Sequence, residues 1–490
     1  MRHLNQTAAV LASLAGLAAP AAAQWSSDPA TNLALADRTG EQVQGKIVAI
    51  PGGGYWVSWF DNATGGYDVY LQRLNADGTE AFAHNGLLVA DRGFSSTQDY
   101  GLAVDADGNA YLAYRDDRSG SVRTTLTKVA PDGTFVWGDG PTFDADFIGN
   151  PRVAPLADGG AVVGWSESAS FRLHRVNAQG EPVWGETGVE VAEADRLLTL
   201  SDLKPSDDGT VIALTVRTAT SFFLSPKGLS VQKFDADGNA LWNGGDLVTV
   251  YSPDEAGQSI QMGYFPTFEN DGEGGAVVTW YDNGDTRNAW VQHVRSDGSL
   301  VFAGNGLAAS GDPSLIRVSA EGAYDPAGGE YYVGFMTATL NQSMWGYRVQ
   351  KFSADGVAQW GDGLILDPLD AAQPTPAKIV WSGDGVIAAW GDGHLLAARI
   401  DADGSDAWGG PIAASSRESP KSRIALAPAP KGGAVVVWSD GDFGAADLLA
   451  QNINADGSLG TEPCAADFDG SGTADVNDLL GFLGAFRTQG

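Results

Sequence analysis

Oxygen-bearing side chains recur at alternate positions of a short segment near the end of the chain, from Asp467 to Asp478. They occupy positions 1, 3, 5, 9 and 12 of a twelve-residue loop, and Gly472 stands at position 6, where the backbone must turn sharply. Calcium takes six or more hard oxygen ligands, and this spacing is typical of its loops. The sequence therefore predicts calcium as a cofactor, bound by Asp467, Asp469, Ser471, Thr473 through its backbone carbonyl, Asp475 through water, and Asp478.

An amphipathic helix is expected directly after this loop, because apolar residues from Val476 to Phe486 fall at helical spacing on one face. The loop and the Leu479-Leu480 pair resemble dockerin domains, which attach secreted polysaccharide-degrading proteins to cohesins. The resemblance covers about residues 464–490 and one loop, whereas dockerins have two. It implies a dockerin-like segment over 463–490, with a cohesin-like or cell-surface partner for the tail.

Six carboxylates occupy the same position of a repeated sequence pattern. Each stands two residues after the aromatic residue that ends an apolar run, as Glu167 does after Trp165. One interpretation is a surface for cations or sugar hydroxyls, or a pair of acids for glycoside cleavage. The other, which we favour because these acids follow the repeat, is that they cap backbone N–H groups in turns. The six are Asp61, Asp116, Glu167, Asp282, Asp392 and Asp440.

The histidines form no recognisable catalytic or metal-binding pattern. Their places in the repeats differ, and the sequence contains no Gly-rich phosphate loop and no nucleophile elbow. We therefore predict no catalytic and no cofactor-binding residues outside the calcium loop. The histidines are His3, His84, His174, His293 and His394.

A short sequence pattern recurs eight times between Leu71 and Leu459: an apolar run followed by a turn that contains glycine. The repeats are spaced by about 50 residues, which is typical of β-propeller blades. Each repeat holds short β-branched and aromatic runs separated by Gly, Asn and Asp, which favours antiparallel strands joined by tight turns. We predict an all-β propeller over 24–462 with eight blades, or seven if the unit around Thr215 is displaced. The turn glycines are Gly78, Gly133, Gly180, Gly238, Gly298, Gly356, Gly404 and Gly457.

An aromatic residue stands four positions after seven of these glycines, and we expect most of them to pack between blades. Thr461 breaks the rule in the last repeat. The missing outer strand is expected from the segment Asn32-Leu33-Ala34-Leu35-Ala36, which follows Trp25, so that the N- and C-terminal strands together close the ring. The seven aromatics are Phe82, Trp137, Trp184, Trp242, Phe302, Trp360 and Trp408.

The first 23 residues are typical of a signal peptide, with Arg2, an apolar run and a small-residue site before Gln24. We expect a secreted or cell-surface protein without a transmembrane segment. The formal net charge of −32 argues against nucleic acid as a partner and favours cations. The single cysteine, Cys464, excludes an internal disulfide framework.

The repeats resemble those of large secreted bacterial surface proteins, as in Gly53–Asp61 followed by Asp68–Leu74. Asp235–Trp242 also resembles repeats of eight-bladed quinoprotein dehydrogenases and a related outer-membrane assembly scaffold. Several of those enzymes place an adjacent cysteine pair over pyrroloquinoline quinone, whereas this chain has a single cysteine. The motif therefore implies blade architecture here and not quinone chemistry.

We interpret the protein as a secreted calcium-binding propeller that binds or scaffolds extracellular polysaccharide or surface proteins. One alternative is a carbohydrate-active hydrolase or lyase on the same scaffold, which requires two carboxylates in a deep, asymmetric pocket. A second alternative is a purely structural surface module, which predicts no pocket.

Overall fold

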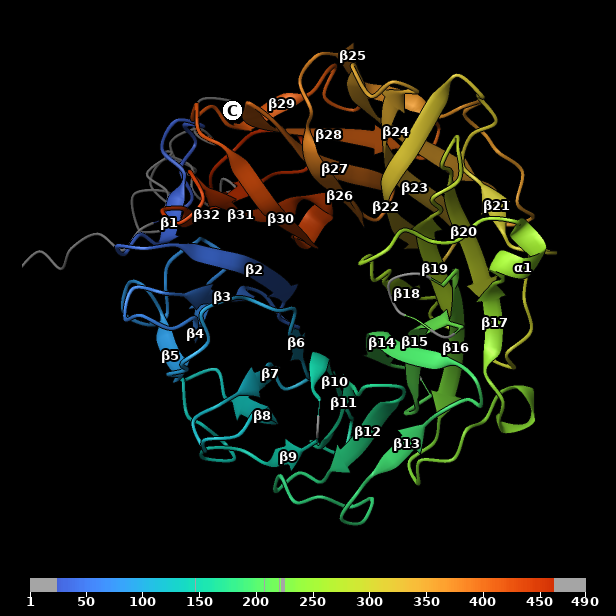
Figure 1. Ribbon diagram of the computed structural model, residues 1–490. Helices are drawn as coiled ribbons and strands as arrows, with labels where there is room; N and C mark the ends of the chain where they lie inside the picture. The colour runs from blue at the N-terminus through green and yellow to red at the C-terminus, as the bar shows by residue number, and fades with distance from the viewer. Residues whose placement is uncertain (1–23, 146, 207, 220, 222–224, 462–490) are drawn as a thin grey trace, which may run out of the picture.

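The computed structural model describes residues 24–461, except 146, 207, 220 and 222–224. The predicted signal peptide over 1–23 and the predicted calcium loop with its six ligands lie outside these residues. Within the described part of the chain, no helix is long and apolar enough to cross a membrane. The described chain folds as a ring of eight four-stranded antiparallel sheets, which confirms the all-β propeller and its eight blades (Figure 1).

The first four blades follow one another in sequence, and each begins with its innermost strand. The unit around Thr215 is the fourth blade of the ring and is not displaced. Their strands are β2 (Gln42–Ala49), β3 (Tyr55–Asp61), β4 (Asp68–Leu74), β5 (Leu87–Ala90); β6 (Gly101–Val104), β7 (Ala110–Asp116), β8 (Arg123–Val129), β9 (Thr142–Asp144); β10 (Gly149–Pro155), β11 (Ala161–Ser166), β12 (Phe171–Val176), β13 (Val189–Val191); and β14 (Leu197–Pro205), β15 (Val211–Thr218), β16 (Lys227–Phe234), β17 (Val248–Tyr251).

The last four blades have the same order. Short helical turns interrupt the connections: η1 (Asn243–Gly245), α1 (Pro253–Ala256) and η2 (Pro430–Gly432). The strands are β18 (Phe268–Asn270), β19 (Ala276–Tyr281), β20 (Ala289–Val294), β21 (Leu307–Ala308); β22 (Leu315–Asp325), β23 (Glu330–Thr339), β24 (Trp345–Phe352), β25 (Leu364–Asp370); β26 (Thr375–Trp381), β27 (Gly385–Asp392), β28 (His394–Asp401), β29 (Ile412–Ser415); and β30 (Lys421–Pro428), β31 (Ala434–Asp440), β32 (Asp447–Ile453).

The two ends of the propeller close the ring. The N-terminal strand β1 (Leu33–Ala36) pairs antiparallel with β32, with Leu33 opposite Ala450, and so becomes the outermost strand of the eighth blade. This confirms the strand expected from residues 32–36. Trp25 takes the place of the aromatic that Thr461 lacks, because its indole packs on Gly78 and its Nε1 donates to the Ala76 carbonyl at 2.9 Å.

The turn glycines form the seams between blades. The aromatic of one repeat lies against the turn glycine of the next, as Trp137 does at Gly180 and Trp408 at Gly457. At Gly180 the backbone has φ +80°, and an added Cβ would lie 2.8 Å from the Trp137 ring. Both the conformation and the close approach therefore require glycine. These contacts confirm that the aromatics four positions after the turns pack between blades.

A cation on the third strand of several blades adds a polar link across each seam. Lys233 is an example: its Nζ lies 2.5 Å from Asp208 of its own blade and 2.8 Å from the Gly274 carbonyl of the next. In the fifth blade a histidine, His293, takes this place. The equivalent pairs are Lys128–Asp105, Arg175–Asp158, His293–Asp271, Lys351–Glu330 and Arg399–Asp384.

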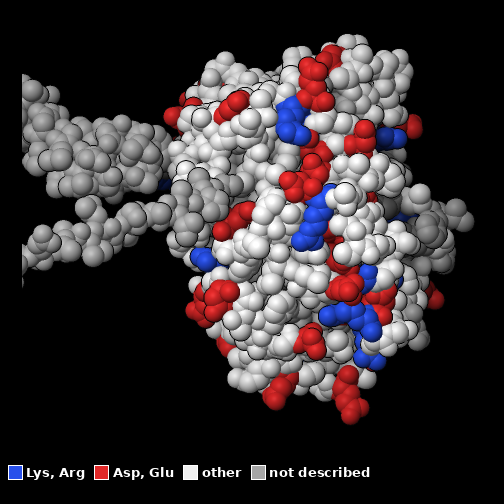
Figure 2. Space-filling model, turned by 90° about the vertical axis from the view of Figure 1, so that its left-hand side faces the viewer, with Lys and Arg blue, Asp and Glu red and all other residues white. Residues whose placement is uncertain are grey.

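Charged side chains at the surface are mixed in sign. Figure 2 views the ring from the side of its first and eighth blades, and most Lys and Arg side chains there lie beside Asp or Glu. Among the described residues on this side, the cations do not gather into a patch that would attract an anionic polymer.

Candidate functional site

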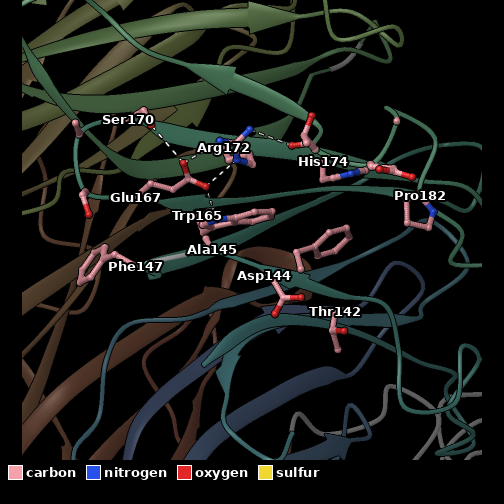
Figure 3. A pocket seen from close by; sticks show the side chains of 16 residues that line it. Thr142, Asp144, Ala145, Phe147, Trp165, Glu167, Ser170, Arg172, His174 and Pro182 are labelled. Atoms are coloured by element: carbon pink, nitrogen blue, oxygen red, sulfur yellow. Dashed lines mark hydrogen bonds and ion pairs between the residues drawn. The ribbon is translucent and has the colours of Figure 1, made fainter. Parts of the chain in front are cut away.

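A cavity of about 900 Å³ opens between the second and third blades, near the rim of the ring (Figure 3). One wall is the outer strand β9 and the segment after it, and the other is β11, β12 and the loop that leads to β13. Ligand-binding pockets commonly have volumes of about 300–1,000 Å³. The groove is therefore large enough for a small molecule or a segment of a polymer.

The groove lies where the repeat changes. The third strands of five blades carry a glutamine at one register position, and His174 holds this position in the third blade. In the fourth blade, Gln232 accepts the N–H of Trp242 at 2.9 Å and donates to the Asp246 carbonyl at 2.6 Å. The five glutamines are Gln72, Gln232, Gln292, Gln350 and Gln451.

This glutamine fastens the loop between the third and fourth strands to the sheet. In the first, fourth, fifth and sixth blades its Oε1 accepts the N–H of the aromatic four residues past the turn. The His174 ring cannot supply an amide in that geometry, and its Nδ1 lies 3.3 Å from the Arg175 carbonyl. The corresponding loop of the third blade, residues 181–188, contributes Pro182, Glu186 and Thr187 to the groove. The His174 ring lies against this loop, because a Cβ added to Gly188 would meet it at 2.8 Å.

Aromatic rings form the floor of the groove. Phe143 stacks on Trp165 with ring centroids 5.4 Å apart and lies 4.7 Å from the ring of His174. These three side chains are almost fully buried, whereas Phe147 at the edge of the groove is 49% exposed. An exposed aromatic at the edge of a polar groove offers an apolar face to a ligand.

The polar wall is built around one ion pair. Arg172 binds Glu167 through two hydrogen bonds, from Nε at 2.7 Å and from Nη2 at 3.0 Å. Glu190 on β13 lies 3.7 Å from the same guanidinium and accepts a hydrogen bond from Ser170 at 2.9 Å. Figure 3 shows Glu167, Ser170 and Arg172 together on one side of the groove. The wall thus presents hydroxyl, carboxylate and guanidinium groups in fixed positions.

Charges in the groove follow from burial and pairing. Burial lowers the pKa of His174, which keeps its imidazole neutral at neutral pH. The hydrogen bonds from Arg172 to Glu167, together with the charge of that carboxylate, raise the pKa of Arg172 against the effect of burial. Asp144 on the opposite wall lies 2.7 Å from Arg123 and is 69% exposed. The groove therefore holds fixed charges of both signs.

The repeated carboxylates mostly cap turns, as we favoured from the sequence. Asp61, Asp116 and Asp282 each accept the backbone N–H two residues further along, at 2.9–3.1 Å. Burial raises the pKa of Asp61. For Asp116, the hydrogen bonds from Arg118 outweigh the effect of burial and lower the pKa.

Two of the six carboxylates have other partners. Asp440 is 4% exposed and lies 3.1 Å from the buried Lys421, and it accepts a hydrogen bond from the Trp438 indole at 2.9 Å. Glu167 is the only one of the six among the residues that line the groove of Figure 3. Asp392 ends β27, and its side chain lies outside the description. The structure therefore places one of these acids in a cavity and uses four for local structure.

The other histidines with described partners lie apart from the groove. His84 contacts Glu80 at 3.2 Å and Asp37 at 3.1 Å. His293 is buried and joins Asp271 to Tyr331, with distances of 2.9 Å and 2.8 Å. Among residues 24–461 as described, no three His, Cys, Asp or Glu residues are placed to hold a metal ion.

The central channel is a second cavity, of about 310 Å³, lined by the innermost strands. Bulges in these strands precede several charged residues that line it, such as Lys46 and Arg152. Both cations contact Asp99, at 2.7 Å and 2.5 Å. They lower the pKa of Asp99 although burial alone would raise it. The groove between the blades is the better candidate site, because it is larger and has the exposed aromatic Phe147 at its edge.

No family model matches the sequence, and no curated protein matches it. Solved structures that resemble the ring share little sequence with it. An ulvan lyase from a new polysaccharide lyase family is 9% identical, with 90% of this chain and 96% of that chain covered and a TM-score of 0.45. A Penicillium chrysogenum α-L-arabinanase complexed with arabinobiose is 14% identical, covering 62% and 92%, with a TM-score of 0.34. A Dyadobacter fermentans protein of unknown function is 11% identical, covering 88% and 98%, with a TM-score of 0.38.

Proposed function

We propose that the protein is a carbohydrate-binding protein that holds a neutral, hydroxyl-rich polysaccharide in the groove between its second and third blades. The observation that carries the proposal is the combination of an exposed aromatic, Phe147, with fixed hydrogen-bonding groups at Glu167, Ser170 and Arg172. Sugars offer apolar faces for an aromatic ring and hydroxyls that both donate and accept hydrogen bonds.

The charge of the groove favours a neutral ligand. Asp144, Glu186 and Glu190 add acidic groups around the cavity, and the chain as a whole has a formal net charge of −32. The negative charge of the chain would repel an anionic polymer. The cation that lines the groove, Arg172, is already paired with Glu167.

The groove supports binding over glycoside cleavage. Cleavage requires one carboxylic acid that delivers a proton to the leaving oxygen and a second carboxylate that acts as base or nucleophile. Arginine already engages two of the acids that line the groove, since Arg172 binds Glu167 and Arg123 binds Asp144. The purely structural alternative predicts no pocket, so the groove speaks against it.

The N-terminal and C-terminal segments add export and attachment to the proposal. Export by the first 23 residues would bring the propeller to extracellular polysaccharide. The calcium loop from Asp467 to Asp478 would let the tail attach to a cohesin-like or cell-surface partner. The motifs of the sequence support both parts.

The test is calorimetric titration of the full chain against neutral polysaccharides (arabinan, xylan, mannan, laminarin) and acidic ones (ulvan, alginate). We expect binding to at least one neutral polymer and weaker binding to the acidic ones. Phe147→Ala should weaken this binding by about fivefold, because a stacked aromatic contributes about 1 kcal/mol. The matched control is Phe443→Ala, which removes a 97% exposed phenylalanine from the eighth blade and should leave affinity unchanged.

Two outcomes would contradict the proposal. If no neutral polymer binds, or if Phe147→Ala and Phe443→Ala behave alike, the groove is not the binding site. Release of reducing ends or of unsaturated products during incubation would instead establish the hydrolase or lyase alternative.

A further inference from the structure

A second groove lies directly beside the first. It has a volume of about 470 Å³ and is lined by β13 and the outer part of the fourth blade. An arginine–glutamate pair, Arg217 with Glu193, again stands in its wall, and both of these side chains are about one-third exposed. Leu247 is half-buried there, and Phe234 is almost fully buried behind it. The two grooves therefore share an arginine–glutamate pair in adjacent seams.

The wall between the grooves is the three-residue strand β13. At about 3.3 Å per residue it extends only about 10 Å. Glu190, in its middle, is opposite Arg172 in the pairing of β12 with β13 and lines the second groove. Its side chain is 52% exposed. Val189 and Val191 on either side of it pack on the apolar cluster of the third and fourth blades.

We propose that the two grooves form one continuous tract, so that the ligand is an extended polysaccharide that crosses β13 at Glu190. This inference rests on the proposed function and adds the length of the ligand to it. The first groove binds one part of the chain, and the second binds the continuation of the same chain. A short oligosaccharide fills the first groove only.

The experiment measures affinity along a length series. The full chain is titrated with oligosaccharides from disaccharide to octasaccharide, cut from the arabinan, xylan, mannan or laminarin that binds. Affinity should rise by about tenfold or more once the oligosaccharide reaches both grooves, because the second contact is then intramolecular. The double variant Glu193→Gln and Arg217→Gln should remove this gain and leave disaccharide affinity unchanged.

The matched control is Arg118→Gln, which removes a guanidinium of similar exposure from a turn of the second blade outside both grooves. It should leave the whole length series unchanged. Affinity that does not increase with length, or an unchanged gain in the double variant, would overturn the tract while the binding site in the first groove stands. If none of the neutral polymers binds, both the proposed function and the tract are wrong.

Discussion

Replacing His174 with glutamine restores the residue that five other blades carry at this position. The new amide should accept the N–H of Trp184 and donate to a carbonyl of the loop over 181–188, as Gln232 does in its own blade. The loop should then close over the groove. Because glutamine already serves this position elsewhere in the ring, His174→Gln is expected to fold.

The size of the effect follows from the hydrogen bonds. Two new bonds, each worth about 1 kcal/mol, favour the closed loop by about 2 kcal/mol. At about 1.4 kcal/mol for each factor of ten, affinity for the neutral polymer should fall by about 30-fold. The free energy of unfolding should rise by about 1 kcal/mol, because the two new bonds add about 2 kcal/mol and the lost contact between the His174 ring and Phe143 removes about 1 kcal/mol.

The assay is calorimetric titration of the variant beside His84→Gln, the same chemical change at a histidine outside the groove. Hydrogen exchange of residues 181–188 reports closure independently of the ligand. If these amides become more protected while affinity stays unchanged, closure of the loop does not control binding. If His84→Gln weakens binding as much as His174→Gln, the effect does not come from the groove.

Three further predictions concern the rest of the chain. Trp25→Ala should lower the free energy of unfolding by about 3 kcal/mol in denaturant titration, because it empties the last seam of the ring; unchanged stability would show that the ring closes without it. Hydrogen bonds from His293 and two backbone N–H groups outweigh burial and lower the pKa of Asp271. This carboxylate therefore stabilises the fold above its unfolded pKa of about 4, and the stabilisation is lost as pH falls through the lower folded pKa. Asp271→Asn should make the free energy of unfolding, measured by denaturant titration, fall less steeply as the pH is lowered below about 4. An unchanged pH dependence would contradict a stabilising role of the Asp271 carboxylate. Asp467→Ala with Asp469→Ala should abolish one calcium site in calorimetry, and a site that survives would place calcium elsewhere.

The repeats made the architecture predictable from the sequence. Turn glycines and aromatics recur in fixed register because each seam needs a small residue in a left-handed turn and a large one packed on it. The break at Thr461 and the apolar segment after Trp25 were enough to predict ring closure. Thr215 stands on the second strand of its blade where the other blades have an aromatic such as Trp165, and it is fully buried there without displacing the blade.

The groove was not predicted, although its signal is present in the sequence. Aligning the third-strand runs shows His174 in a column of glutamines, but its meaning depends on a hydrogen bond that forms only in the folded blade. Glu167 is one of six equivalent acids in the sequence, and its partner Arg172 has a counterpart at the same register in Arg348 of the sixth blade, so neither residue stands out from the repeat. The second groove depends on the short β13, which separates it from the first groove.

The decisive measurement for binding in the groove is hydrogen exchange of the full chain with and without a saturating neutral polymer. We expect protection on binding to concentrate in residues 142–145, 147 and 181–191, which border the groove between the second and third blades and the strand beside it. Protection confined to the turns that follow Asp61 and Asp440, or spread evenly around the ring, would contradict binding in the groove.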